Sequence, residues 1–154
     1  MLKRRLLFPV IALVAVAVFT GCGKDDPDPA PPQRTNTEKI TSSSWRFQSA
    51  TAAGTDISSN PQLACFVDNV ITFNSNLTGN ISEGANVCVP TTAGAFTWSF
   101  GAGETTLQLS TVLFPGGSST FTIVSLTDVN LVLSQNVVIP PSSSPIPVTV
   151  TFQH

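Results

Sequence analysis

Charged side chains are scarce in this sequence. They make up 10% of its 154 residues, against roughly 25% in average proteins. Basic residues are especially few: once the N-terminal Lys3, Arg4 and Arg5 are set aside, four cations face nine carboxylates, a net charge near −5. Because a phosphate-binding surface needs clustered Lys and Arg, this composition argues against a nucleic-acid partner.

Groups that could perform catalysis are also in short supply. The single histidine is the C-terminal His154, which we expect to be frayed, and any Ser-His-Asp arrangement would have to recruit it. We therefore expect neither an enzyme nor a cofactor. A metal site is not expected either, because two cysteine sulfurs do not complete a zinc shell. Asp68 and Asn69 would supply only two side chains toward the six or more oxygens that calcium takes.

Tyrosine is absent, whereas Phe, Trp and β-branched residues are frequent, and this bias favours strands over helices. The 3.6-residue periodicity of a long helix is missing as well. We expect only one short helical turn, at Thr37 to Ser43, with Glu38 near its start.

Residues 36–154 instead show short segments in which apolar and polar residues alternate, separated by turn residues such as Asn74-Ser75-Asn76. These segments predict an all-β domain of about eight antiparallel strands, arranged as a barrel or a sandwich. Closure into a barrel is preferred because an open sheet would leave two long edges with few lysines to protect them. The expected inward positions are Trp45 and Phe47; Val67, Asn69, Ile71 and Phe73; Leu77, Gly79 and Ile81; Phe96, Trp98 and Phe100; Leu107 and Leu109; Phe121, Ile123 and Leu126; Val129, Leu131 and Leu133; Val148, Val150 and Phe152.

Residues 1–21 have the organisation of a secretory signal peptide. A basic start precedes an apolar run from Leu6 to Phe19, and Phe19-Thr20-Gly21-Cys22 resembles a bacterial lipobox. The run is shorter than the roughly 20 residues of a transmembrane helix. We therefore predict cleavage before Cys22 and a lipid such as palmitate at this residue, which would attach the protein to a membrane. The alternative is an uncleaved apolar anchor.

Residues 22–35 are acidic and rich in proline, without bulky apolar side chains, and are predicted to form a disordered tether. Lys24-Asp25-Asp26 resembles the export signal that sends Bacteroidota lipoproteins to the outer face of the outer membrane. We expect a lipid-anchored, surface-exposed location in the outer membrane. A plain acidic linker is the alternative reading of the triplet.

Lipidation of Cys22 leaves Cys65 and Cys88 as a pair in an oxidising compartment, where a disulfide is the expected state. The bond would close a loop of 23 residues. In the chain-entropy model such a loop stabilises a fold by roughly 3 kcal/mol. Two buried free thiols are the alternative.

Eight aromatic residues of the predicted barrel could either line a cup for an apolar ligand or fill the core. Each large apolar side chain contributes about 1.5–3 kcal/mol when buried, and a chain with few charges needs most of these residues for stability. A filled core is therefore favoured over an open cavity. The eight residues are Trp45, Phe47, Phe73, Phe96, Trp98, Phe100, Phe121 and Phe152.

Several segments keep a characteristic order over most of residues 39–135. They are Ser44-Trp45 after a helical turn, Cys65-Phe66-Val67-Asp68-Asn69, Thr72-Phe73, Cys88, Phe96-Thr97-Trp98, Leu107-Gln108-Leu109, Phe121 to Leu126 and Leu131-Val132-Leu133. Together they resemble the lipocalin-like domains of Bacteroidota lipoproteins. The resemblance implies an up-and-down barrel with Trp45 at its closed end and Cys65 bridged to Cys88.

These observations predict a membrane-anchored, non-catalytic, lipocalin-like lipoprotein. We expect it to bind a small apolar or amphipathic molecule, or a partner, at the open end of the barrel. Loops around Pro115 to Ser118 and Pro140 to Pro147 are expected to contribute to recognition. The alternative function is a structural or adhesive surface module, with a solid barrel, that binds protein or glycan.

Overall fold

The computed structural model describes residues 32–114, 116–138 and 143–154. The predicted signal peptide, Cys22 and most of the predicted tether lie outside these residues. The elements in chain order are α1 (Asn36–Ile40), β1 (Trp45–Ala52), β2 (Thr55–Asp56), the 3₁₀ helix η1 (Pro61–Leu63), β3 (Val70–Phe73), β4 (Thr78–Ser82), β5 (Gly94–Gly101), β6 (Thr106–Leu109), β7 (Thr120–Leu126), β8 (Asn130–Val137) and β9 (Ile146–Gln153).

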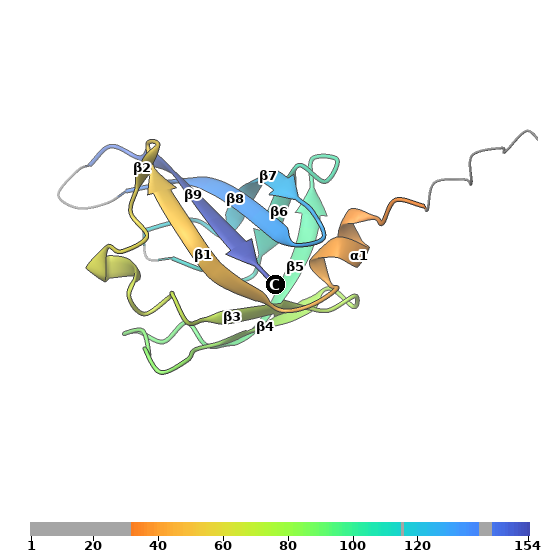
Figure 1. Ribbon diagram of the computed structural model, residues 1–154, viewed down its shortest axis with the longest axis horizontal. Helices are drawn as coiled ribbons and strands as arrows, with labels where there is room; N and C mark the ends of the chain where they lie inside the picture. The colour runs from red at the N-terminus through yellow and green to blue at the C-terminus, as the bar shows by residue number, and fades with distance from the viewer. Residues whose placement is uncertain (1–31, 115, 139–142) are drawn as a thin grey trace, which may run out of the picture. The chain divides into compact units, whose positions relative to one another are not determined.

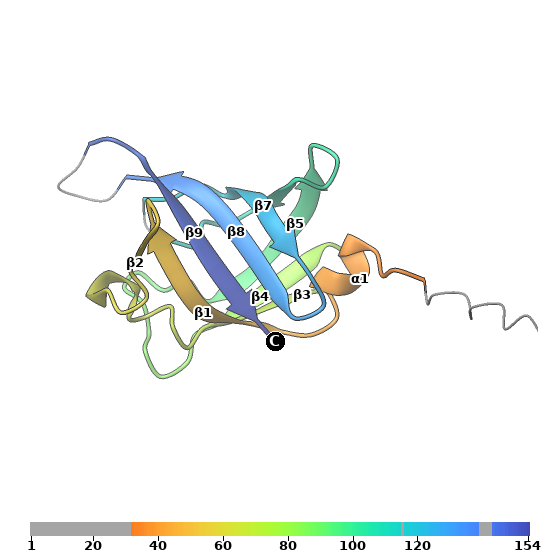
Figure 2. The same ribbon diagram turned by 45° about the horizontal axis from the view of Figure 1, so that its top comes forward.

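The described strands form one antiparallel sheet that closes on itself. Its order is β2-β1-β3-β4-β5-β6-β7-β8-β9, and β1 also pairs with β9. β2 only extends the end of β1, so eight strands make up the barrel wall. Figures 1 and 2 show β9 between β1 and β8, where the closure is made. The predicted all-β, up-and-down barrel is confirmed.

The barrel has two different ends. We call closed end the one at Trp45, the first residue of β1, where β9 finishes and β8 begins. The open end is the opposite one, where Ala52 pairs with Val148 and Val137 pairs with Ile146. α1 and the open-end loops therefore lie at opposite ends of the barrel (Figure 1).

α1 is the predicted helical turn, although it begins at Asn36 and ends at Ile40. Thr35 caps it: the Thr35 hydroxyl accepts a hydrogen bond from Glu38 N, and the Glu38 carboxylate accepts one from Thr35 N. This reciprocal capping box supports a helix too short to be stable alone. Hydrogen bonds from the Thr35 backbone and hydroxyl lower the pKa of Glu38.

Trp45 seals the closed end. Its side chain is fully buried, and its indole N–H donates to the carbonyl oxygen of Ile40 at 2.8 Å. The His154 ring lies 3.8 Å from the Trp45 ring, between centroids. The helix, the first strand and the last residue of the chain are thus held together around one aromatic side chain.

A β-bulge divides β1 into two halves. The register against β9 shifts between Phe47 and Ser49. Before the shift the inward residues are Trp45 and Phe47, and after it Ala50 is the buried residue. Without the extra residue, strict alternation would have turned Ala50 outward. The bulge therefore lets large side chains fill the closed end and a small one face the open end.

Three expected inward positions are wrong, because each falls in a turn or loop rather than in a strand. Val67 is 40% exposed, since β3 begins only at Val70. Leu77 is 50% exposed and has a φ of 65° in the turn between β3 and β4. Val129 is 56% exposed, in a turn held by the Thr127 hydroxyl. The remaining expected positions lie on the inner face, buried or partly buried.

The disulfide between Cys65 and Cys88 is confirmed. It joins the segment that precedes β3 to the loop between β4 and β5. The sheet, the core and this disulfide all belong to a compact unit, Gln33–His154. A fragment with these bounds carries everything that an independently folding domain needs.

Gly79 is required where β4 passes the ring of Phe96 on β5. The two residues are paired, and a Cβ at Gly79 would overlap the Phe96 ring and the Thr72 carbonyl oxygen. We predict that Gly79→Ala destabilises the domain by about 1–3 kcal/mol through overpacking. Urea unfolding of the fragment Gln33–His154, followed by tryptophan fluorescence, measures this change.

The outward Asn80→Ala variant is the control for a change in the same strand and is expected to have a smaller effect. Shortening the ring with Phe96→Leu in the Gly79→Ala background should restore part of the lost stability. Additive losses in the double variant would contradict the steric explanation.

Candidate functional site: a pocket at the open end of the barrel

A pocket of about 430 Å³ lies at the open end of the barrel. Its walls are mostly aliphatic and aromatic, and its uncharged polar groups come from two amide side chains, Asn60 and Gln62. The lining residues are Ala50, Ile57, Asn60, Gln62, Leu63, Phe66, Phe114, Gly116, Val137, Val138, Val148 and Val150. This size and chemistry are typical of sites for small apolar molecules.

One wall is the sheet itself. Ala50, Val137, Val148 and Val150 are buried residues of β1, β8 and β9, and Ala50 is paired with Val150. Strand alternation brings these side chains to the inner face. The small volume of Ala50, turned inward by the bulge, leaves space at this level of the barrel.

The other wall is the connection between β2 and β3, which contains Ile57, Leu63 and Phe66. Backbone hydrogen bonds fasten its start to β1, because Ile57 N donates to Ala50 O at 2.9 Å. The Asn60 side chain caps η1 by accepting from Gln62 N at 2.9 Å. The disulfide at Cys65 then fixes the end of this wall next to Phe66.

Two aromatic rings form the floor of the pocket. Phe66 and Phe114 meet edge to face, with centroids 5.2 Å apart. Both also border a much smaller hollow of about 10 Å³, which touches Phe47, Asn69 and Phe152. A hollow of that size holds about one water molecule. Within the described residues, the barrel is therefore filled toward its closed end and hollow toward its open end.

The predicted aromatic set belongs to the filled part. Trp45, Phe73, Phe96, Trp98, Phe121 and Phe152 are buried, whereas Phe47 and Phe100 are partly buried against the same core. Edge-to-face contacts join many of them, including Phe73 with Phe96 and with Trp98. None of the eight lines the large pocket, and only Phe47 and Phe152 border the small hollow.

Apart from Gly116, the pocket is built from residues that no sequence pattern assigned to a site. Val148 and Val150 were expected to face inward, but alternation does not say whether an inward residue meets a neighbour or a hollow. Ile57, Leu63 and Phe114 lie outside regular strands, where no periodic signal marks them. Of the loops expected to contribute to recognition, Gly116 lines the pocket, whereas Pro115 and residues 139–142 lie outside the described part.

Carboxylates near the open end are held by neutral donors. Asp56 accepts hydrogen bonds from the Ser58 hydroxyl and backbone, which lower its pKa. Glu83 accepts from Thr92 N at 2.7 Å and from the hydroxyls of Thr91 and Thr92, and the bond from the Thr92 backbone contributes most to lowering its pKa. Glu83 thereby ties the loop before β5 to the end of β4.

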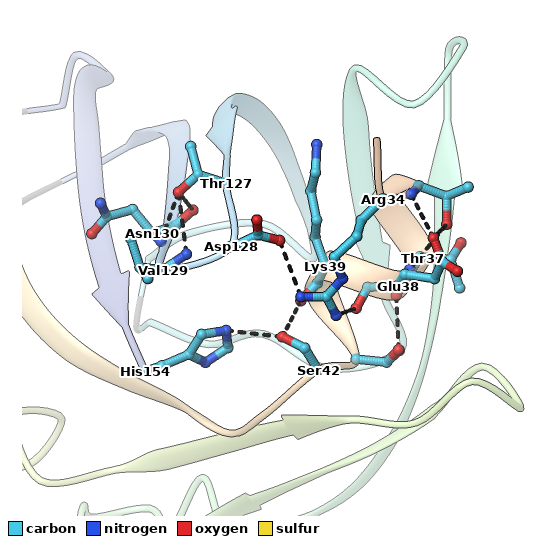
Figure 3. A network of polar contacts seen from close by, with 12 residues as sticks. Arg34, Thr37, Glu38, Lys39, Ser42, Thr127, Asp128, Val129, Asn130 and His154 are labelled. Carbon is cyan, nitrogen blue, oxygen red and sulfur yellow. Dashed lines mark hydrogen bonds and ion pairs between the residues drawn. The ribbon is translucent and has the colours of Figure 1, made fainter. Parts of the chain in front are cut away.

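His154 is not frayed, contrary to expectation. Its Nδ1 lies 3.1 Å from Ser44 O, to which it donates. Its Nε2 lies 3.1 Å from the Ser42 hydroxyl (Figure 3). Because the ring also stacks on Trp45, the terminal residue is docked on the closed end. The group at Nδ1 is a carbonyl and not a carboxylate, so the contacts seen here do not form a Ser-His-Asp arrangement.

Arg34 and Asp128 complete the network at the closed end, with 3.1 Å between Arg34 Nη1 and Asp128 Oδ1 (Figure 3). Arg34 also donates to the carbonyl oxygen of Glu38 at 2.7 Å. Both partners of the ion pair are substantially exposed, so its contribution to stability is small. In residues 32–154, gaps excepted, no three His, Cys, Asp or Glu side chains form a group that could hold a metal. No helix in the part of the chain that is described is long and apolar enough to span a bilayer.

A closed antiparallel up-and-down β-barrel of eight strands belongs to a class whose interior is either filled by side chains or holds one small ligand. The chain belongs to the family of the lipocalin-like domain, whose profile matches residues 42–133, from the segment before β1 into β8. No curated protein matches the sequence. The family is generally a non-enzymatic binding fold.

The lowered pKa of Glu83 predicts a specific acid sensitivity. A carboxyl whose pKa is lower in the folded than in the unfolded state stabilises the fold above the unfolded pKa, near 4.3 for glutamate. That stability is lost as the pH falls through the folded pKa. We therefore expect Glu83→Gln to cost stability at pH 7 and to cost less as the pH falls below the ordinary glutamate value. Urea unfolding of both proteins between pH 7 and pH 3 measures the difference, and a difference independent of pH would contradict this role.

Proposed function

We propose that this protein is an exported lipoprotein whose barrel binds a small apolar molecule at the open end. The observation that carries the proposal is the 430 Å³ pocket with walls of Ala, Val, Ile, Leu and Phe. Apolar surface in such a pocket is released from water when a ligand enters it, which favours binding. The filled closed end supplies the stability that allows the open end to stay hollow.

The anchor in this proposal is the lipid on Cys22, behind a signal peptide of residues 1–21 and ahead of an acidic tether. The basic start, the short apolar run and the lipobox-like end support it. We further propose that the Lys24-Asp25-Asp26 triplet directs the protein to the outer face of the outer membrane of a Bacteroidota cell. The tether would then present the barrel away from the bilayer.

The structural or adhesive alternative required a solid barrel. The part of the barrel toward the closed end fits that description, because the hollow beneath the pocket floor measures only about 10 Å³. The open end does not, and a surface that served only as a scaffold would have no need for a lined apolar pocket. Binding of a small apolar molecule is therefore the function that the geometry supports best.

A large side chain that fills the pocket should weaken the binding of an apolar ligand. We predict that Ala50→Phe lowers the affinity of the fragment Gln33–His154 for the uncharged dye N-phenyl-1-naphthylamine by at least about tenfold, which corresponds to roughly 1.4 kcal/mol. Fluorescence titration measures it. Ala95→Phe, on the outer face of β5, is the matched control and should bind like the parent. Native mass spectrometry of the parent from its own host should also show a bound molecule that Ala50→Phe lacks. If Ala50→Phe and Ala95→Phe bind the dye with equal affinity, the pocket is not the binding site.

Removing the anchor residue tests the lipoprotein part separately. In cells fed an alkyne-tagged palmitate analogue, we expect the full chain to be labelled and Cys22→Ala to be unlabelled, with its signal peptide retained. The control is a Cys65→Ala, Cys88→Ala double variant, which lacks the disulfide but keeps Cys22 and should still be labelled. Labelling that persists without Cys22 would disprove the anchor.

A further inference from the structure

The distribution of charge along the chain separates the two ends of the barrel. Residues 47–154 contain no Lys or Arg, and all their formal charge at neutral pH comes from five carboxylates. The three described cations belong to the closed end. Arg34 pairs with Asp128 there, Lys39 lies on α1, and Arg46 is the second residue of β1, opposite Gln153 of β9. The pocket is therefore built without a cationic side chain.

No carboxylate lines the pocket either, but three lie on segments that adjoin it. Asp56 directly precedes the lining residue Ile57, and Asp68 lies two residues beyond the lining residue Phe66. Asp68 accepts from the backbone and side chain of Asn86 at 3.0 and 3.1 Å. Glu83 holds Thr92, which borders the small hollow beneath the pocket floor. The described donors to these carboxylates are all neutral, so no cation of the described residues is placed on this side of the barrel.

The side chain of Asn69, beneath the pocket floor, favours a hydrogen-bond donor over an anion. Asn69 is 7% exposed, and its Nδ2 donates to the Thr92 hydroxyl at 3.4 Å. Its Oδ1 is buried without a hydrogen-bond partner among the described residues, and Asn69 borders the small hollow. A buried amide oxygen is satisfied by a hydrogen-bond donor such as a hydroxyl. A carboxylate or phosphate oxygen that carries no proton can only accept, and would repel it.

We propose that the pocket selects by charge: it takes uncharged apolar molecules with a hydroxyl as head group, and it rejects carboxylate and phosphate amphiphiles. This inference rests on the proposed function. It holds for either orientation of the ligand. A head group directed at the floor points toward the buried Asn69 oxygen, and a head group at the mouth meets no cationic side chain. In neither place does a cation offset the loss of water around an anion.

The test compares three ten-carbon ligands that differ in their head group. Decanol, decanoate and decylamine displace N-phenyl-1-naphthylamine from the fragment Gln33–His154 at pH 7.5, below their micelle concentrations. We expect decanol to bind at least about tenfold more tightly than decanoate, because burial of an uncompensated charge is costly. Equal affinities would overturn the inference, and so would tighter binding of decylamine than of decanol.

A cation placed at the pocket should change this preference. Gln62 lines the pocket and is exposed, so Gln62→Lys adds an ammonium group without a change in the core. Decanoate should then bind about tenfold more tightly than to the parent while decanol is unchanged. The matched control is Gln108→Lys on the outward face of β6, which adds the same charge away from the pocket.

The outcomes separate this inference from the proposed function. If the dye and all three ligands fail to bind, the proposed function falls and the charge preference falls with it. If decanol and decanoate bind equally to the parent, the pocket is a binding site but does not select by charge. A gain for decanoate of the same size in Gln108→Lys would show an effect of net charge, and would overturn the local explanation.

Discussion

Strand β1 carries the constraint on which the rest of the structure depends, because it must pair on both of its edges to close the barrel. On one edge it follows β9 from Arg46 to Ala52, and on the other it meets β3 at Trp45 and Arg46 alone. Beyond those two pairs, the second edge of β1 pairs with β2 and contacts the segment that follows β2. The sheet is therefore fully closed at one end. At the other end β1 and β3 separate, and the connection between β2 and β3 forms the pocket wall.

The bulge in β1 makes this division possible within a single strand. The residues before it fill the closed end with Trp45 and Phe47, and the residue after it, Ala50, leaves room for a pocket. Burial of aromatic and aliphatic side chains toward the closed end contributes most of the favourable free energy of folding. The disulfide and the backbone hydrogen bonds of the β2–β3 connection hold the wall of the pocket at the open end. The packed core and the pocket thus occupy different levels of one barrel.

The same division appears in the polar groups. At the closed end, opposite charges and the docked His154 join α1 to the strands, and Trp45 lies under them. At the open end, Asp56 and Glu83 accept hydrogen bonds from hydroxyl and backbone donors, and the pocket is lined by apolar and amide groups only. The lining of the pocket therefore contains no cationic side chain.

The sequence by itself determined the all-β class, the short helical turn and the pairing of Cys65 with Cys88, because alternation, turn residues and cysteine count are local or countable signals. It favoured a closed barrel over a sandwich because few lysines protect the edges of an open sheet. It also marked the inner face of most strands, and failed at Val67, Leu77 and Val129, where a turn displaced the strand end. Only the tertiary structure decided where the barrel is hollow. Whether an inward side chain meets a neighbour or a space depends on the bulge in β1, on the short pairing with β3 and on a connection without periodicity. Those are relations between segments far apart in the chain, and no local pattern encodes them.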